Sequence, residues 1–431
     1  MISVEVSQIM ERKINNDLLK WRRDSINKPL FLYGSKCVGK TFSVLDFGKK
    51  YYKNIAYFDT DNNIELISIF EKEKVLTKLV AKLSFLCGET IFEDDTLIVF
   101  DNLESDNLMK DLKIFSNNNS KYQVIIISSN RVKINKLQIE EFYYRSMYNM
   151  DFFEYLSNTD KAQLIDFIKD SYETGNSMPF HQMALEAYYE YLVTGGFPEV
   201  VDAKINGKSD LEIEAIKQKI FDVYRSEYAK EDLALSVKCN EIMKVLPLEL
   251  MKENKKFQYG VIRKGARSKE YENSIEYLVY NGIVHRSFRI TDISKSLASM
   301  KDQESFKLYF NDAGILYSKM FLNKAKLLTD TDIRRALIEN DVANSLTKHG
   351  FSLYYYQSDG KAEINFVIQN RAGKIIPIEV VNMKLTKAKA MSFFLSKYGF
   401  KDCIRLTEGN FSFKKGVKCI PVYAIACLND L

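Results

Sequence analysis

A loop that can bind phosphate stands near the start of the chain. The apolar run of residues 29–33 leads into the pattern G-x-x-x-x-G-K-T, which spans Gly34–Thr41. Gly34 and Gly39 allow the backbone to curve until its N–H groups point inward at phosphate oxygens. The side chains between the two glycines belong to Ser35, Lys36, Cys37 and Val38.

Two side chains at the end of this loop supply the remaining phosphate chemistry. Lys40 can reach the β- and γ-phosphates of a nucleoside triphosphate, and the Thr41 hydroxyl can hold Mg²⁺. The next residues read as a helix, whose N-terminal dipole favours an anion. A chance pattern in a surface turn is the alternative, but a strand before the loop and a helix after it argue against that reading. The loop therefore predicts a site for ATP and Mg²⁺.

A carboxylate is expected beside Thr41. The apolar run of residues 96–100 ends in Asp101 and reads as a strand buried on both faces of a parallel sheet. At the carboxyl end of that strand, Asp101 could complete the Mg²⁺ coordination shell. An ordinary aspartate that caps the next helix is the alternative.

The strand predicted over residues 122–130 offers weaker candidates. Ser128 or Ser129 at its end could sense the γ-phosphate. Arg131 and Arg145 follow, at positions from which an arginine could act on the nucleotide of a neighbouring subunit. Arginines that contact only the surface or a lid are the alternative and the simpler explanation.

These residues require a parallel sheet with helices between its strands. Strand-like and helical runs alternate over residues 1–150, which predicts a P-loop NTPase domain of the doubly wound α/β class. Residues 151–245 read as a helical lid. Two short helices, a recognition-type helix and a β pair predict a winged-helix-like module over residues 246–325, able to bind either protein or DNA. Residues 326–431 read as a further α/β domain.

The composition is that of a soluble globular protein. The 431 residues are 46% hydrophobic and 28% charged, and about two to four domains are expected for this length. No run of about 18 apolar residues predicts a membrane span. Six cysteines without a C-x-x-C pair and only three histidines make a structural zinc site improbable and indicate a reduced, cytoplasmic protein.

Positive charge gathers near the end of the chain. The net charge is only +5, yet the segment Lys384–Lys418 carries nine basic residues against two acidic ones. Aromatic residues alternate with them, which suits a DNA or RNA surface. Solvated lysines over buried aromatic residues are the alternative explanation of the same pattern.

The order of these segments resembles a bacterial and archaeal family of AAA-type ATPases whose C-terminal domain, of unknown function, is similar to a restriction-endonuclease core. The resemblance covers nearly the whole chain. It rests on the phosphate loop and on these further stretches: Asp101–Glu104, Gly195–Glu199, Lys255–Tyr259, Phe306–Gly314, Glu339–Asn340 and the strands around Glu363 and Glu379.

The chain departs from the family at the glutamate that polarises the attacking water. The family pattern is Asp-Glu-Ile-Gln, whereas here Asn102 follows Asp101. An amide cannot accept the proton of that water, and general-base assistance contributes roughly 10²–10⁴-fold to a rate. Glu104, at the family's glutamine position, or a residue of a partner subunit could supply the carboxylate. We therefore expect ATP binding with slow or absent hydrolysis.

The nuclease-like domain also departs from its family pattern. Where the family has Glu-x-Asp-Phe and Glu-Val-Lys, this chain has Asn365 in place of the aspartate and Val381 in place of the lysine. Loss of one metal-binding charge and of the lysine that orients water predicts an inactive nuclease. Lys384 could substitute for the lysine only if the strand ends early.

The sequence thus predicts an ATP-binding conformational switch. Three alternatives stay open: an active ATPase that uses Glu104 or a partner residue, a nucleic-acid-binding regulator for which ATP is only a ligand, and an active nuclease. A homo-oligomer or another protein partner is compatible with each of them, and no membrane contact is expected.

Overall fold

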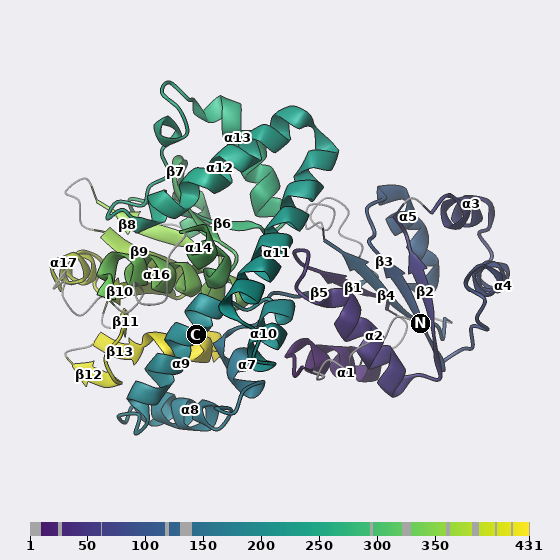
Figure 1. Ribbon diagram of the computed structural model, residues 1–431, viewed down its shortest axis with the longest axis horizontal. Coiled ribbons are helices and arrows are strands. Elements are labelled where there is room, and N and C mark those ends of the chain that lie inside the picture. Colours follow the sequence, from purple (N-terminus) through teal and green to yellow (C-terminus); the bar gives the residue numbers. More distant parts are fainter. Residues whose placement is uncertain are drawn as a thin grey trace. The chain divides into compact units, whose positions relative to one another are not determined.

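The computed structural model describes residues 10–430, except 25–27, 62, 117–119, 130–139, 294–295, 321–328, 359–362, 382–387, 401–402 and 415–416. These residues form two compact units (Figure 1). The N-terminal unit contains residues 10–149 with 280–282, and the C-terminal unit contains residues 150–279 and 283–430. None of the helices within the described ranges has the length and hydropathy of a membrane span.

A five-stranded sheet in the order β2-β3-β4-β1-β5 forms the centre of the N-terminal unit, and every neighbouring pair is parallel. The strands are β1 (Leu30–Tyr33), β2 (Asn54–Asp59), β3 (Thr96–Asp101), β4 (Gln123–Ser128) and β5 (Tyr143–Ser146). Parallel neighbours need crossover connections, which helices provide here. The helices are α1 (Ile14–Asp24), α2 (Lys40–Tyr51), α3 (Ile64–Lys72), α4 (Leu76–Cys87), α5 (Asp106–Asp111) and the 3₁₀ helix η1 (Leu112–Ser116). The predicted parallel α/β architecture is confirmed.

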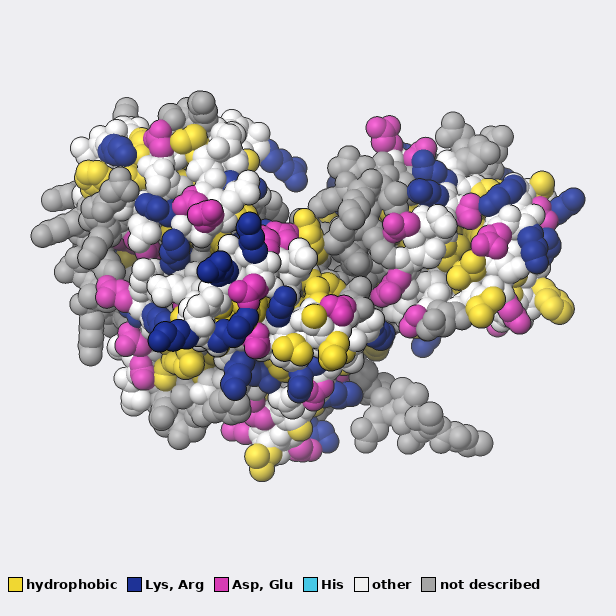
Figure 2. Space-filling model, turned by 90° about the horizontal axis from the view of Figure 1, so that it is seen from above, with side chains coloured by type: hydrophobic (Ala, Val, Ile, Leu, Met, Phe, Trp, Pro, Cys, Tyr) yellow, Lys and Arg dark blue, Asp and Glu magenta, His cyan; other side chains and the backbone are white. Residues whose placement is uncertain are grey.

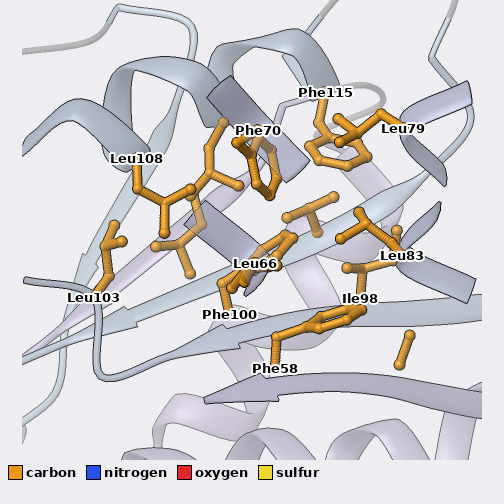
Figure 3. Close-up of a cluster of buried hydrophobic side chains, with 14 of the residues drawn as sticks. Phe58, Leu66, Phe70, Leu79, Leu83, Ile98, Phe100, Leu103, Leu108 and Phe115 are labelled. Atoms are coloured by element: carbon orange, nitrogen blue, oxygen red, sulfur yellow. The ribbon is translucent and has the colours of Figure 1, made fainter. Parts of the chain in front are cut away.

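Alternate residues of these strands are buried on opposite faces of the sheet. On one face, Phe58 of β2 and Phe100 of β3 stack at 5.2 Å, and Phe70 of α3 meets Phe100 edge-on (Figure 3). Helices α3, α4 and α5 cover this face. The helical segment between β2 and β3 is divided into α3 and α4, because Glu73 and Val75 between them are extended.

An eight-stranded sheet in the order β12-β13-β11-β10-β9-β8-β6-β7 lies in the C-terminal unit. Its strands are β6 (Val284–Ile290), β7 (Lys301–Phe310), β8 (Tyr354–Gln357), β9 (Glu363–Gln369), β10 (Ile375–Val381), β11 (Cys403–Thr407), β12 (Ser412–Lys414) and β13 (Val417–Pro421). The hairpin of β6 and β7 joins the later strands because β6 pairs parallel with β8. The expected boundary between residues 325 and 326 therefore does not separate two sheets: the strands on both sides of it form one.

Helices make up the rest of the C-terminal unit, and the region expected as a helical lid is helical. They are α7 (Phe152–Ser157), α8 (Leu164–Thr174), α9 (His181–Thr194), α10 (Pro198–Ile205), α11 (Asp210–Glu231), α12 (Leu233–Met251), α13 (Ser268–Tyr280), α14 (Ala313–Lys319), α16 (Thr331–Lys348), α17 (Ala388–Tyr398) and the 3₁₀ helices η2 (Tyr259–Val261), η3 (Leu297–Ser299) and η4 (Val422–Asp430). On the face drawn in Figure 2, basic and acidic side chains are interspersed.

Candidate nucleotide site

The loop between β1 and α2 has the backbone conformation that its glycines predict. Gly39 has a φ of 91° and directly precedes α2. Cys37 also has a positive φ, 66°, although it is not a glycine. The side chain of Val38, between them, is buried. Two left-handed residues around one buried anchor give the tight curve that a phosphate-binding loop needs.

Lys40 folds back over the loop that precedes it. Its Nζ donates hydrogen bonds to the carbonyl oxygens of Gly34 (2.8 Å) and Ser35 (2.9 Å). Burial lowers the pKa of Lys40 to about 8, although the Asp101 carboxylate partly offsets this effect. The ammonium group is therefore at the loop, held by neutral carbonyl oxygens, where a phosphate could bind it.

Thr41 and Asp101 meet as the ends of their elements predict. Thr41 Oγ1 donates a 2.6 Å hydrogen bond to Asp101 Oδ2, and Asp101 is buried. The hydroxyl of Tyr57 on β2 donates to the same oxygen at 2.9 Å. Burial and the Asp101 charge raise the pKa of Tyr57 well above its usual value. We did not identify Tyr57 from the sequence; its signal is its place in β2, two residues before the strand ends.

This pair suits Mg²⁺ bound together with a nucleotide. A hydroxyl and a carboxylate are oxygen ligands, and Mg²⁺ takes one or two protein oxygens together with phosphate oxygens and water. Among the described residues, no group of three or more His, Cys, Asp or Glu side chains is arranged to hold a metal ion. Thr41 and Asp101 would hold the ion, which would neutralise charge on the phosphates.

The residue after Asp101 is strained and bonded to the neighbouring strand. Asn102 has a φ of 56°, and its Nδ2 donates a 3.1 Å hydrogen bond to Asp59 Oδ1 at the end of β2. The sequence analysis did not single out Asp59 as a candidate. Glu104 is exposed, and within the described part of the chain it makes no hydrogen bond or ion pair.

The weaker candidates are engaged elsewhere. The buried hydroxyl of Ser128 donates to the carbonyl oxygen of Leu103 at 2.9 Å, which holds the turn after β3. Arg145 lies on β5, pairs with Asp17 at 3.4 Å and stacks on Tyr143. These contacts agree with the alternative that Arg145 is a surface arginine. Arg131 lies outside the described residues.

A buried arginine joins the loop to the segment that follows β5. Arg12 donates hydrogen bonds to the carbonyl oxygens of Val38 (2.8 Å) and Tyr148 (2.7 Å) and is 9% exposed. Nearby, a Cβ atom on Gly34 would lie 1.9 Å from the carbonyl oxygen of Met147, so only glycine fits there. The sequence predicts neither the hydrogen bonds of Arg12 nor the close approach of Gly34 to Met147. Arg12 precedes the first regular element.

A second group of charged residues lies in the C-terminal unit. Lys255 Nζ is 2.6 Å from Glu339 Oε2, and Lys307 Nζ is 2.6 Å from Glu363 Oε1 and 3.6 Å from Glu339 Oε1. Tyr309 donates a 2.8 Å hydrogen bond to Glu339 Oε1. The side chains of Lys255, Lys307 and Glu339 are at most 3% exposed. We call these five residues the lysine–glutamate cluster.

The charges of this cluster compensate one another. Burial alone would raise the pKa of Glu339, but the ammonium groups of Lys255 and Lys307 outweigh it and lower that pKa to about 2. For Lys307, the attraction of Glu363 and Glu339 likewise outweighs burial and raises its pKa above the ordinary value. Two cations thus lie beside Glu339 and Glu363, the acids for which the resemblance implies a metal site.

One of the two positions that differ from the family pattern, Asn365, takes part in this arrangement. Asn365 Nδ2 donates to Glu339 Oε2 at 3.1 Å, and its Oδ1 accepts from the Val380 amide at 3.0 Å. Glu379 precedes Val380 in β10. It accepts hydrogen bonds from Arg405 Nε (2.9 Å) and Arg405 Nη2 (2.8 Å). Lys384 lies outside the described residues.

Three family models match the chain in sequence order. Residues 26–156 match "AAA domain", residues 185–326 match "Domain of unknown function (DUF8612)" and residues 334–425 match "Domain of unknown function (DUF4143)". A search of curated proteins found no match.

Among solved structures, "Structure of C. elegans PCH-2" is similar over 39% of this chain at 13% identity, with a TM-score of 0.25. The match covers 50% of the PCH-2 chain, so the present chain spans about half the length of PCH-2. The likeness is too low to carry an argument. The three family matches together support an AAA-type ATPase family, with the AAA domain in residues 26–156.

Proposed function

We propose that this protein binds ATP with Mg²⁺ at the loop Gly34–Thr41 and acts as a nucleotide-dependent conformational switch. The observation that carries the proposal is the 2.6 Å contact of Thr41 with Asp101, beside the loop that Lys40 closes. It combines a cation for the phosphates with oxygen ligands for the metal. The match of residues 26–156 to an AAA domain supports the same ligand.

We propose that hydrolysis by this site is slow or absent. Asn102 stands where AAA-type relatives of this family have a glutamate, and its amide donates to Asp59. Water would therefore meet no carboxylate at that position, although the phosphate loop and metal ligands are intact. Glu104 is the other carboxylate that could activate water. Among the described residues it makes no hydrogen bond or ion pair that would direct it toward the phosphate loop.

A nuclease-like domain without cleavage activity completes the proposal. Glu339 and Glu363 are compensated by Lys255 and Lys307 at 2.6 Å each, so a divalent cation would have to displace buried ammonium groups. Plasmid DNA incubated with the protein and Mg²⁺ or Mn²⁺ is expected to stay intact. Metal-dependent nicking that disappears in Glu363→Ala would contradict this part of the proposal.

Nucleic-acid binding has less support from the described residues. Lys384, Lys387, Lys401 and Lys415 of the basic segment lie outside them, as do the side chains of Lys389 and Lys414. Of the rest, Arg405 pairs with Glu379 and the Lys418 ammonium lies 4.0 Å from the Tyr172 ring centroid. The face in Figure 2 shows basic side chains interspersed with acidic ones. The proposed partners are DNA or RNA, a second copy of the chain, and another protein.

The finer domain names belong to the proposal as well. Residues 151–245 would act as a lid of the nucleotide site, residues 246–325 as a winged-helix-like module and residues 326–431 as the nuclease-like domain. The helices α7 to α11 support the first assignment, and α13 followed by the β6–β7 hairpin supports the second. All three lie in the C-terminal unit.

A calorimetric titration of the full chain with ATP and Mg²⁺ tests the proposal. We expect saturable binding that Lys40→Ala abolishes, because its ammonium group is the cation of the loop. Lys49→Ala is the matched control, since Lys49 is an exposed lysine near the far end of the same helix. No heat of binding, or equal binding by Lys40→Ala, would refute the proposed function.

A further inference from the structure

The nucleotide site has a carboxylate at the end of β2, next to the strand β3, after which the resemblance predicts a glutamate. Strands β2 and β3 are parallel neighbours in a register that places Asp59 opposite Asp101. Both strands end there. Asp59 and Asn102 therefore lie at the carboxyl-terminal ends of the strands, where the Thr41–Asp101 pair also lies. In parallel α/β sheets, this carboxyl edge is where ligands bind.

The hydrogen bonds of Asp59 leave one oxygen available. Its Oδ1 accepts from Asn102 Nδ2 at 3.1 Å and from the Asp61 backbone amide at 3.0 Å. Both bonds are on the same oxygen, and Oδ2 accepts none from the described residues. The side chain is exposed, so water has access to it. Asp59 is therefore oriented by two donors and still able to bind a water molecule.

The conformation of Asn102 maintains this arrangement. Its φ of 56° is in the left-handed region, which asparagine tolerates better than most residues. Its backbone amide donates to Asp101 Oδ1 at 2.7 Å, while its side chain donates to Asp59. One residue thus contacts both the carboxylate beside Thr41 and the carboxylate on β2.

We propose that Asp59 supplies the carboxylate that Asn102 lacks, and that the slow hydrolysis of a bound nucleoside triphosphate depends on it. This inference rests on the proposed function. Asn102 acts as a positioning residue that holds Oδ1, so that Oδ2 faces the attacking water.

The chemical step is the ordinary one for this class of site. Asp59 Oδ2 accepts a proton from water while the water oxygen forms a bond to the γ-phosphorus. The bond between that phosphorus and the bridging oxygen breaks, and its electron pair leaves with the nucleoside diphosphate. Inorganic phosphate is the second product, and the proton passes from Asp59 to solvent.

A single-turnover assay with labelled ATP and Mg²⁺, together with calorimetric affinities, tests the role of Asp59. Asp59→Asn keeps the shape of the side chain and removes its charge. We expect the hydrolysis rate to fall by about 10²-fold, the lower end of general-base effects, while the affinity for ATP stays the same with and without Mg²⁺. Glu65→Gln is the matched control, because it removes an exposed carboxylate from the first turn of α3 and leaves both donors to Asp59 in place. Its rate should equal that of the unaltered protein.

Four outcomes would overturn the inference. An unchanged rate in Asp59→Asn would show that another group activates the water. A Mg²⁺-dependent loss of ATP affinity in that variant would make Asp59 a metal ligand. Binding of ATP without any hydrolysis in the unaltered protein would refute the inference and leave the proposed function standing, whereas absence of binding would refute both.

Discussion

The backbone amide of Gly196 donates a 2.8 Å hydrogen bond to Asp312 Oδ2, which joins two motifs far apart in the chain. Asp312 also caps α14 through the Ile315 amide at 3.0 Å. A Cβ atom on Gly195 would lie 2.2 Å from Asp312 Oδ1, and one on Gly314 would lie 2.4 Å from the carbonyl oxygen of Thr194. Close packing at this contact therefore requires the glycines of both motifs.

Gly196→Ala should destabilise the C-terminal unit severely. The added Cβ would lie 2.0 Å from the carbonyl oxygen of Met150, so the backbone must shift and lose the 2.7 Å bond from the Met150 amide to the Gly196 carbonyl oxygen. We expect a loss of about 3 kcal/mol in the free energy of unfolding, the upper range for overpacking. Urea unfolding followed by circular dichroism measures it. Gly260→Ala, where a Cβ meets nothing within 4 Å, should change little; equal effects would contradict the steric argument.

Arg12→Gln should weaken both the N-terminal unit and its affinity for ATP. The substitution removes the donors to the carbonyl oxygens of Val38 and Tyr148, and a buried acceptor left without a partner costs about 1–3 kcal/mol. Fluorescence of Trp21 reports unfolding of this unit, because it is the single tryptophan of the chain and is buried in α1. Arg22→Gln is the control, since the bond of Arg22 to the Tyr51 carbonyl oxygen is exposed. If the unfolding transition followed by Trp21 fluorescence is not shifted in Arg12→Gln, Arg12 does not stabilise the loop.

Lys307→Met should destabilise the C-terminal unit and make it more sensitive to acid. Breaking one partner of a buried ion pair typically costs about 3–5 kcal/mol. The folded pKa of Glu339 is about 2, below its ordinary value of 4.5, so the stability from its charge is present above pH 4.5 and is lost as pH falls toward 2. Without Lys307 the folded pKa rises, and the loss should begin at higher pH. Unfolding free energies measured from pH 7 to pH 3 would show this; parallel curves for the two proteins would contradict it.

Asp341→Asn should change the pH dependence in the opposite direction. Burial, with Asp312 and Asp151 nearby, raises the pKa of Asp341 to about 6, although Lys348 and Tyr188 act against it. Because this folded pKa is above the unfolded one, stability falls as pH rises from about 4 to about 6, by an amount of about 3 kcal/mol. The asparagine can still accept the 2.7 Å bond from Tyr188 and carries no charge. Its unfolding free energy should therefore fall less over that range, and an unaltered slope would refute the assignment.

Local patterns allowed much of the N-terminal unit to be predicted. The loop Gly34–Thr41 is contiguous, and the strand before it and the helix after it are specified by neighbouring residues. The approach of Asp101 to Thr41 was predictable because parallel strands end at one edge of a sheet.

Contacts between distant residues could not be predicted in the same way. Nothing near Asn102 in the chain indicates that Asp59 lies beside it, since this depends on which strand is the neighbour of β3. Likewise, the register of β2 and β3 decides that Tyr57 reaches Asp101. Lys255 and Glu339 were both noted as parts of motifs, yet their 2.6 Å ion pair follows only from packing.

The pairing of β6 with β8 has a consequence for the order in which the chain can fold. During synthesis from the N-terminus, β6 leaves the ribosome first, and its partner strand β8 begins 64 residues after β6 ends, since 354 − 290 = 64. Until then the backbone groups of β6 that will pair with β8 stay exposed, and such an open edge invites pairing with other chains. At about 5–20 residues per second this exposure lasts several seconds. A nascent chain that stalls in that interval would present this open edge to other chains for longer.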